Sequence, residues 1–265
     1  MTALAFNNPR VQQLRRLIGR RSSRHDDRRF VVEGPVLVAE ALAAGWTLVE
    51  QYVPVDSGAD IAGAGEVFEL AAGVFERVGS TEAPQAPIAV VEMPTTSATE
   101  VLTDASFVVV LDRISDPGNL GTIIRSAEAA GVDAVVLTAG SVDPYSPKVV
   151  RSSAGAVFHV PVVTASIDDV AAARLSLIGT SSHDAPARSV LRHLDADLTG
   201  RIALVMGNEA AGLPDDWNDS AGPIRRWITI PHRGRSESLN VAMAATVLLF
   251  EAARQRDQAS ENGGY

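Results

Sequence analysis

Three polar segments of the chain combine residue types that could hold a ligand. The first, 112–131, reads DRISDPGNLGTIIRSAEAAG and follows an apolar run. Pro117 and Gly118 predict a turn, and Asn119 can cap the helix that follows. Arg125 comes one and a half helical turns later, and its guanidinium could bind a phosphate group with two hydrogen bonds. The segment is either part of a ligand site or an ordinary strand–turn–helix junction with a surface arginine.

The second segment, 205–214, reads VMGNEAAGLP. It places Asn208 and Glu209 between two glycines, Gly207 and Gly212, directly after an apolar stretch. Glycines can shape the backbone around a ligand because they lack a Cβ atom. The alternative is a loop in which the asparagine only caps a turn.

The third segment, 228–254, runs from an apolar strand through Pro231 and a polar stretch into a long apolar helix. Ser236 or Ser238 could cap this helix. Capping accounts for one serine, but it does not account for the whole polar stretch before so apolar a helix.

The elements around these segments alternate between strands and helices, which predicts an α/β protein. The apolar strand at 107–111 is typical of a parallel sheet that is buried on both faces. Ligands of such sheets bind in the loops after the carboxyl ends of the strands, where all three segments lie. Further strands are expected at 30–32, 48–55, 66–70, 88–92, 134–138, 159–163, 177–182, 202–207 and 226–230, and helices at 9–24, 36–44, 71–79, 119–130, 147–157, 167–174, 188–192 and 238–255.

The pattern predicts two domains. A small α/β unit covers 1–92, a linker rich in Pro and Thr covers 93–104, and the larger α/β domain covers 105–256, before a flexible tail at 257–265. The length of 265 residues and the 46% of hydrophobic residues suit two packed domains. The chain shows no secretion signal and no long apolar run, so we expect a soluble cytoplasmic protein. It has no cysteine, which excludes disulfides, thiolate metal sites and a cysteine nucleophile.

Charge is distributed unevenly along the chain. The net charge is −9, yet residues 1–30 hold eight arginines against Asp26 and Asp27, so the rest of the chain carries −15. An acidic body with a basic N-terminal arm suits local docking onto a polyanion such as RNA. The alternative is a solvated helix face.

Taken together and in this order, the three segments resemble the motifs of the SpoU/TrmH family in the SPOUT superfamily of RNA methyltransferases. The motif N-L-G-x-I-x-R matches Asn119–Arg125, G-N-E-x-x-G-L matches Gly207–Leu213, and I-P…E-S-L-N matches Ile230–Asn240. The segments 28–42 and 143–162 also look like the family's pattern. Two departures are His232, where an apolar residue is common, and Gln85-Ala86-Pro87, which replaces the usual Gln-Gly.

The resemblance implies a C-terminal SPOUT α/β domain with a trefoil knot, preceded by a small α/β RNA-binding domain of ribosomal-protein-like fold. It also implies a homodimer whose interface is built from helices of the knot region. The apolar stripe of the last helix suits such an interface, or it packs within one subunit. Its members are Val241, Ala245, Leu248 and Leu249.

The resemblance further implies transfer of a methyl group from S-adenosylmethionine to a ribose 2′-hydroxyl, without a metal. Arg125 is then the catalytic residue, either as a base or as a phosphate clamp, although a guanidinium does not easily give up its proton. The other catalytic residues implied are Asn119, Glu209, Ser238 and Asn240. The implied cofactor-binding residues are Leu204, Gly207, Asn208, Ile230, Pro231, Ser238 and Leu239.

The RNA-binding residues are expected in the N-terminal unit and in the second domain: Arg24, Arg28, Arg29, Lys148 and Arg151. The two-domain layout resembles the enzymes that modify ribosomal RNA, so 23S rRNA is the expected substrate. A tRNA ribose methyltransferase and a non-catalytic RNA-binding protein of the same fold are the alternatives. A nucleotide-dependent α/β enzyme is disfavoured, since the chain has neither a P-loop nor the sequence G-x-G-x-x-G after its strands.

Overall fold

The computed structural model describes residues 3–181, 190–218, 222–235 and 238–262. The chain divides into two compact units. Unit 1 consists of Met1–Thr95 together with Asp143–His159, and unit 2 consists of Thr96–Val142 together with Val160–Tyr265. The segment 143–159 therefore packs within the first unit, although the sequence assigned it to the larger domain.

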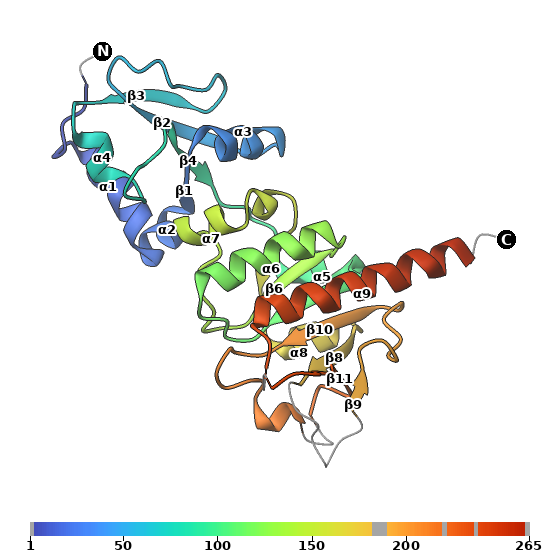
Figure 1. The fold of residues 1–265 in the computed structure, drawn as a ribbon. Helices are drawn as coiled ribbons and strands as arrows, with labels where there is room; N and C mark the ends of the chain where they lie inside the picture. Colours follow the sequence, from blue (N-terminus) through green and yellow to red (C-terminus); the bar gives the residue numbers. More distant parts are fainter. Residues whose placement is uncertain (1–2, 182–189, 219–221, 236–237, 263–265) are drawn as a thin grey trace. The chain divides into compact units, whose positions relative to one another are not determined.

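Unit 1 contains a four-stranded sheet with the strand order β1-β4-β2-β3 (Figure 1). Its elements are α1 (Pro9–Gly19), α2 (Arg21–Asp27), β1 (Arg29–Glu33), α3 (Pro35–Ala43), β2 (Leu48–Pro54), β3 (Glu66–Leu70), α4 (Val74–Val78), β4 (Ile88–Glu92), α7 (Pro147–Ser152) and the 3₁₀ helix η1 (Ala156–Phe158). β4 is antiparallel to β1 and to β2, whereas β2 and β3 are parallel. Helix α1 packs on the sheet because Val11, Leu14 and Leu17 recur at helical spacing and are buried in one cluster with strand residues.

Unit 2 contains a seven-stranded sheet with the order β7-β6-β5-β10-β8-β11-β9. Its elements are α5 (Ala98–Asp104), β5 (Phe107–Leu111), α6 (Pro117–Ala129), β6 (Ala134–Leu137), β7 (Val162–Thr164), α8 (Ile167–Ala172), β8 (Ser176–Thr180), β9 (Val190–Arg192), β10 (Ile202–Met206), the 3₁₀ helix η2 (Asp215–Asn218), β11 (Arg226–Thr229) and α9 (Val241–Asn262). Every pair of neighbouring strands is parallel in the described part of the chain. β5 and β10 are buried along their whole length, as an apolar run in a parallel sheet predicts.

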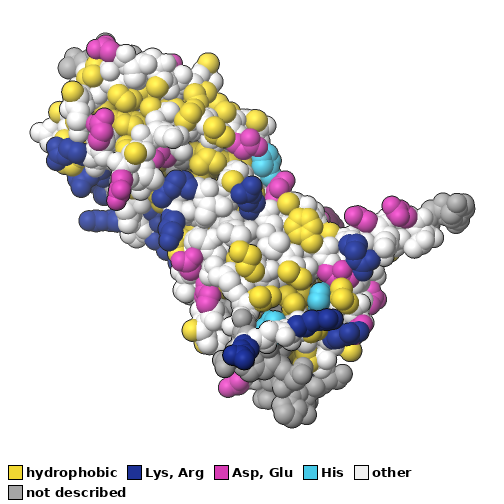
Figure 2. Space-filling view, viewed as in Figure 1, with side chains coloured by type: hydrophobic (Ala, Val, Ile, Leu, Met, Phe, Trp, Pro, Cys, Tyr) yellow, Lys and Arg dark blue, Asp and Glu magenta, His cyan; other side chains and the backbone are white. Residues whose placement is uncertain are grey.

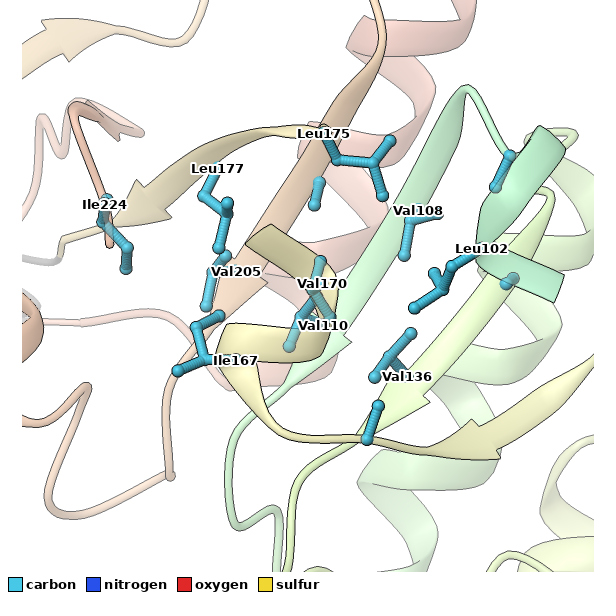
Figure 3. Close-up of a cluster of buried hydrophobic side chains, with 14 of the residues drawn as sticks. Leu102, Val108, Val110, Val136, Ile167, Val170, Leu175, Leu177, Val205 and Ile224 are labelled. Carbon is cyan, nitrogen blue, oxygen red and sulfur yellow. The ribbon is translucent and has the colours of Figure 1, made fainter. Parts of the chain in front are cut away.

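Helices cover both faces of this sheet. On one face, Leu102 of α5 and Ile167 and Val170 of α8 pack against Val108 and Val110 of β5 (Figure 3). On the other face, α6 and α9 lie side by side (Figure 1). Burial of such a side chain contributes roughly 1.5–3 kcal/mol, so these two layers stabilise the sheet.

The strand order places the three polar segments next to one another. β5, β10, β8 and β11 are consecutive in the sheet, and because they are parallel their carboxyl ends lie at the same edge. The segments that follow β5, β10 and β11 are the three that the sequence singled out. The sheet therefore brings together residues that are up to 121 positions apart in the sequence.

Several predicted elements differ from the structure. The helix expected at 188–192 is wrong for its described part, because Val190–Arg192 forms strand β9; residues 188 and 189 lie outside the described residues. The segment predicted as a linker, 93–104, contains helix α5, which Ser97 caps through a reciprocal pair of contacts with Glu100. Helix α9 begins at Val241 and continues to Asn262, beyond the expected start of the tail at 257.

Among the described residues, no helix combines the length and the apolar composition that crossing a membrane requires. The trefoil knot stays a prediction.

Candidate active site

A cavity of about 610 Å³ opens at the carboxyl edge of the sheet in unit 2. Strands β8, β10 and β11 contribute residues at their carboxyl ends, α6 contributes its first turn, and α9 contributes its first two turns. The described residues that line it are Asn119, Thr180, Ser181, Met206, Gly207, Asn208, Glu209, Ala210, Ala211, Gly212, Leu213, Ile228, Ile230, His232, Ser238, Leu239, Asn240, Val241, Ala244 and Leu248. The cavity thus has one apolar wall and one polar rim.

The segment after β5 directs the side chain of Asn119 towards this rim. The cap of α6 is Asp116, whose Oδ1 accepts a hydrogen bond from the backbone N–H of Asn119 at 2.8 Å. The expectation that Asn119 caps the helix is therefore wrong. Its amide is instead available for contacts with the other two segments.

The segment after β10 forms a tight turn around Asn208. Oδ1 of Asn208 accepts hydrogen bonds from the backbone of Ala210 and Ala211, each at 3.0 Å. Gly207 allows this turn, because a Cβ atom there would lie 2.4 Å from the backbone carbon of Gly212. No side chain fits at position 207, so the turn brings backbone groups to the edge of the cavity.

Glu209 connects this turn to the segment after β5. Its carboxylate accepts hydrogen bonds from the Asn119 amide at 3.0 Å, from the Asp116 backbone at 3.2 Å, and from the backbone and hydroxyl of Ser115 at 3.2 and 3.1 Å. Asn208 Nδ2 donates to the backbone carbonyl of Arg113 at 2.8 Å, which is a second link between the two segments.

Asn240 adds the third segment to the same network. Its Nδ2 donates to Oδ1 of Asn119 at 3.0 Å. Its own Oδ1 accepts from the backbone N–H groups of Ala242 and Met243 at 2.9 and 3.3 Å, so Asn240 caps α9. The cap is therefore not Ser238, and Ser236 lies outside the described residues. One chain of side-chain contacts runs from Glu209 through Asn119 to the start of α9.

The hydrogen bonds keep Glu209 ionised. Desolvation by partial burial is the largest single influence and raises its pKa. The hydrogen bonds from the Asn119 amide and from the backbone of Glu209, Asp116 and Ser115 outweigh it together and lower the pKa to about 2. The rim of the cavity therefore carries a fixed negative charge at neutral pH.

Not every residue expected in the site lies there. Asn119, Gly207, Asn208, Glu209, Ile230, Ser238, Leu239 and Asn240 line the cavity. Arg125 is exposed on α6, Leu204 is fully buried within β10, and Pro231 is exposed; none of the three lines the cavity. Thr180 and Ser181 also line the cavity and were not predicted, although the polar end of the strand expected at 177–182 is a signal for them.

The expected RNA-binding residues also differ in their surroundings. Arg24 is buried and pairs with Asp143, with 2.7 Å between guanidinium and carboxylate. Arg28 is exposed and donates to the backbone carbonyl of Pro94, and Arg29 lies 3.8 Å from the carboxylate of Glu92.

The last two residues of that set lie on α7 in unit 1. Arg151 is half-buried and donates a hydrogen bond to Ser80 at 2.5 Å. Lys148 is exposed.

Comparison with known proteins supports the motif assignment. A model of the SpoU rRNA methylase family matches residues 106–250, and a model of an MRM3-like substrate binding domain matches residues 8–89. A 23S rRNA (guanosine(2553)-2′-O)-methyltransferase, RlmP of Bacillus subtilis, is 35% identical over 83% of this chain and 87% of its own length. A 23S rRNA (uridine(2479)-2′-O)-methyltransferase of Streptomyces viridochromogenes is 34% identical over 96% of this chain and 92% of its own length.

A solved structure extends the similarity to the fold. The SpoU methyltransferase AviRb of Streptomyces viridochromogenes, crystallised in complex with the cofactor AdoMet, aligns with a TM-score of 0.83 and 32% identity. The alignment covers 95% of this chain and 99% of that one. The family match spans more than half of the chain, and the two relatives are similar over 83% and 96% of it. The chain therefore belongs to the SpoU rRNA methylase family.

Proposed function

We propose that this protein transfers a methyl group from S-adenosylmethionine to a ribose 2′-hydroxyl of 23S ribosomal RNA. The observation that carries the proposal is the meeting of Asn119, Glu209 and Asn240, from three separate segments, at one cavity in a chain of this family. Two relatives are named as 23S rRNA 2′-O-methyltransferases, and a similar solved structure is named as a complex with AdoMet.

The cavity suits S-adenosylmethionine in size and in lining. Small-molecule sites typically measure about 300–1,000 Å³, and this cavity lies within that range. Leu213, Ile228 and Leu248 supply an apolar wall against which an adenine ring packs. The ionised carboxylate of Glu209 supplies a negative charge that favours a cationic ligand. The backbone groups beside Gly207 are the donors and acceptors for the polar edge of the base.

When bound, S-adenosylmethionine supplies a methyl group on a positively charged sulfur, and the sugar oxygen has to be aligned with that methyl group. Asn119 is held from both sides, because its amide nitrogen donates to Glu209 and its amide oxygen accepts from Asn240. This fixes which way the amide faces at the rim. Asn119 then orients the ribose, and Glu209 and Asn240 are positioning residues that act through it.

Arg125 supplies the positive charge next to the sugar oxygen. A guanidinium stays protonated in proteins, so its role is to bind phosphate and to stabilise the developing negative charge on the oxygen. Arg125 lies outside the cavity lining of its own chain. It acts in the cavity of a second copy of the chain, which makes the homodimer part of the catalytic apparatus.

Helix α9 offers the surface for that homodimer. Of the stripe predicted from the sequence, Ala245, Leu248 and Leu249 are buried within the chain itself. A second stripe consists of Leu239, just before α9, and of Met243, Val247 and Phe250 on the helix. These side chains are between 41% and 59% exposed, and hydrophobic side chains are visible over α9 in Figure 2. This stripe, named the α9 apolar stripe, is where the second copy packs.

Helix α6, which carries Arg125, packs beside α9. Ser126, the neighbour of Arg125, shares a hydrogen bond of 2.7 Å with Thr246, which lies on α9 between Met243 and Phe250. A partner that packs on the stripe therefore comes close to Arg125.

Because the proposed substrate is ribosomal RNA, the enzyme acts in the cytoplasm. The N-terminal domain matched at 8–89 contacts the RNA.

The test is a transfer assay with radioactive methyl-labelled S-adenosylmethionine and separate transcripts of 23S rRNA, 16S rRNA and tRNA. We expect label in 2′-O-methylated nucleosides of the 23S transcript, and no label with the Asn119→Ala variant. Label confined to tRNA would contradict the choice of substrate and leave the chemistry in place. Absence of both label and cofactor binding by calorimetry would indicate an RNA-binding protein without catalysis.

A further inference from the structure

Exposed arginines gather on the first two helices of unit 1. Arg15 and Arg16 lie on α1, Arg20 lies between the two helices, and Arg21 opens α2; all four are exposed. Lys and Arg side chains are visible over α1 and α2 in Figure 2. The backbone N–H of Arg20 donates to the carbonyl of Arg16 at 2.9 Å, so these two residues are one helical turn apart on the same side.

Arg77 is the fifth arginine of this group, because it packs on the same aromatic ring, Phe6, as Arg15. The guanidinium carbons of Arg15 and Arg77 lie 4.6 and 3.8 Å from the ring centroid of Phe6. Arg77 belongs to α4 and is exposed, so two helices present their guanidinium groups around one ring. Arg15, Arg16, Arg20, Arg21 and Arg77 are named the α1–α2 arginine surface.

The buried Arg24 fixes the geometry of this surface. Its guanidinium donates to the carboxylate of Asp143 at 2.7 Å and to the carbonyls of Leu17 and Ile18 at 2.7 and 3.1 Å. Those two carbonyls lie at the end of α1, whereas Arg24 belongs to α2. The contacts therefore lock the turn between the helices, and the exposed arginines on both sides of the turn lie on a preorganised surface.

The charge of the surface selects a polyanion as its partner. Residues 1–30 carry a net +6 in a chain whose other residues carry −15, so the positive potential is local. Guanidinium groups bind phosphate oxygens with two parallel hydrogen bonds. We infer that the α1–α2 arginine surface is the site that binds the sugar–phosphate backbone of the RNA substrate. The inference rests on the proposed function for the existence of an RNA substrate, and it identifies the surface that holds it.

The test is equilibrium binding of the full chain to a 23S rRNA transcript over a series of salt concentrations. Arg16→Gln combined with Arg20→Gln removes two charges from the surface. The matched control combines Arg174→Gln with Arg192→Gln, which removes two exposed arginine charges from unit 2. The slope of log K against log salt is negative, and each lost phosphate contact should make it less steep by about 0.7–0.9. We expect weaker binding by the surface variant at moderate salt and a slope that is less steep by about 1.4–1.8.

Two further measurements distinguish a loss of RNA contacts from a loss of folding or of cofactor binding. Cofactor affinity by calorimetry and the thermal unfolding temperature should be unchanged in the surface variant, because both arginines are exposed. An unchanged affinity and slope in the surface variant would overturn the inference, as would an equal loss in the control variant. If the wild-type protein neither binds nor methylates RNA, the proposed function itself is contradicted, whatever the arginine variants show.

Discussion

At the scale of single residues, Glu209 is the group whose protonation state is most clearly set by its surroundings. Its pKa of about 2 lies below the ordinary value of 4.5 because several hydrogen bonds favour the carboxylate. The stability that the ionised form provides is therefore present above about pH 4.5 and is lost as the pH falls towards 2. A carboxylate of such low pKa is a weak base, which agrees with a positioning role rather than proton removal.

The Glu209→Gln variant tests this role. The substitution keeps the size of the side chain and removes its charge, so the contacts with Asn119 and the backbone weaken. Loss of one charged hydrogen bond predicts a decrease in kcat of roughly tenfold or more. The pH profile between pH 6 and 9 should keep its shape, since Glu209 does not titrate there. A profile that loses its acidic limb in the variant would contradict the positioning role.

The Arg125→Lys variant tests the planar guanidinium. Lysine keeps the positive charge but loses the two parallel hydrogen bonds to phosphate, so we expect activity close to that of Arg125→Ala. Steady-state methyl transfer to the rRNA transcript measures it. Turnover near the wild-type level would show that charge alone is sufficient.

At the scale of single residues, the sequence predicted which residues meet at the site better than it predicted how buried each of them is. The motifs placed Asn119, Glu209 and Asn240 in one site, and the structure joins them by hydrogen bonds. Their catalytic roles stay predictions. The motif did not separate Leu204 from the site, because β10 is buried along its whole length and only its carboxyl end, at Met206, lines the cavity.

At the scale of elements, the apolar strands and amphipathic helices were predictable, and their ends were not. The expected helix at 9–24 is two helices, α1 and α2, with Arg20 in extended conformation between them. Helix α5 was overlooked because the composition of 93–104 suggested a linker. Its capping signal, Ser97 followed three residues later by Glu100, is present in the sequence and was the better guide.

The sequence did not predict ion pairs between residues that are far apart in the chain. Arg24 and Asp143 are 119 positions apart, and both side chains are about 4% exposed.

Replacement of one partner leaves the other charge buried, so Arg24→Met should lower the free energy of unfolding by about 3–5 kcal/mol. Chemical denaturation measures the loss. The Arg20→Met variant is the control, since Arg20 is exposed. Equal stability of the two variants would contradict the role of the pair.

At the scale of the whole molecule, the proposed role of Arg125 requires two copies of the chain. Met243→Glu combined with Phe250→Glu introduces charge into the α9 apolar stripe and should dissociate the dimer in analytical ultracentrifugation. Ala259→Glu combined with Ser260→Glu adds the same charge to the exposed far part of α9 and should leave the dimer intact. A wild-type protein that sediments as a monomer would contradict the proposal.

Mixed dimers test whether Arg125 acts across the interface. The Arg125→Ala and Asn119→Ala variants should each be inactive. After joint unfolding and refolding, half of the dimers are mixed, and each has one complete site, so about a quarter of the activity should return. A mixture that stays inactive would place Arg125 in the cavity of its own chain.

The central claim is methylation of a ribose oxygen in 23S rRNA, and mapping of the modified bond tests it most directly. A 2′-O-methyl group removes the nucleophile that cleaves RNA in alkali, so the adjacent phosphodiester bond becomes resistant. We predict one resistant bond in an unmodified 23S rRNA transcript, dependent on S-adenosylmethionine and absent with the Asn119→Ala variant. A transcript that gains a methyl group on a base, with no resistant bond, would contradict the account.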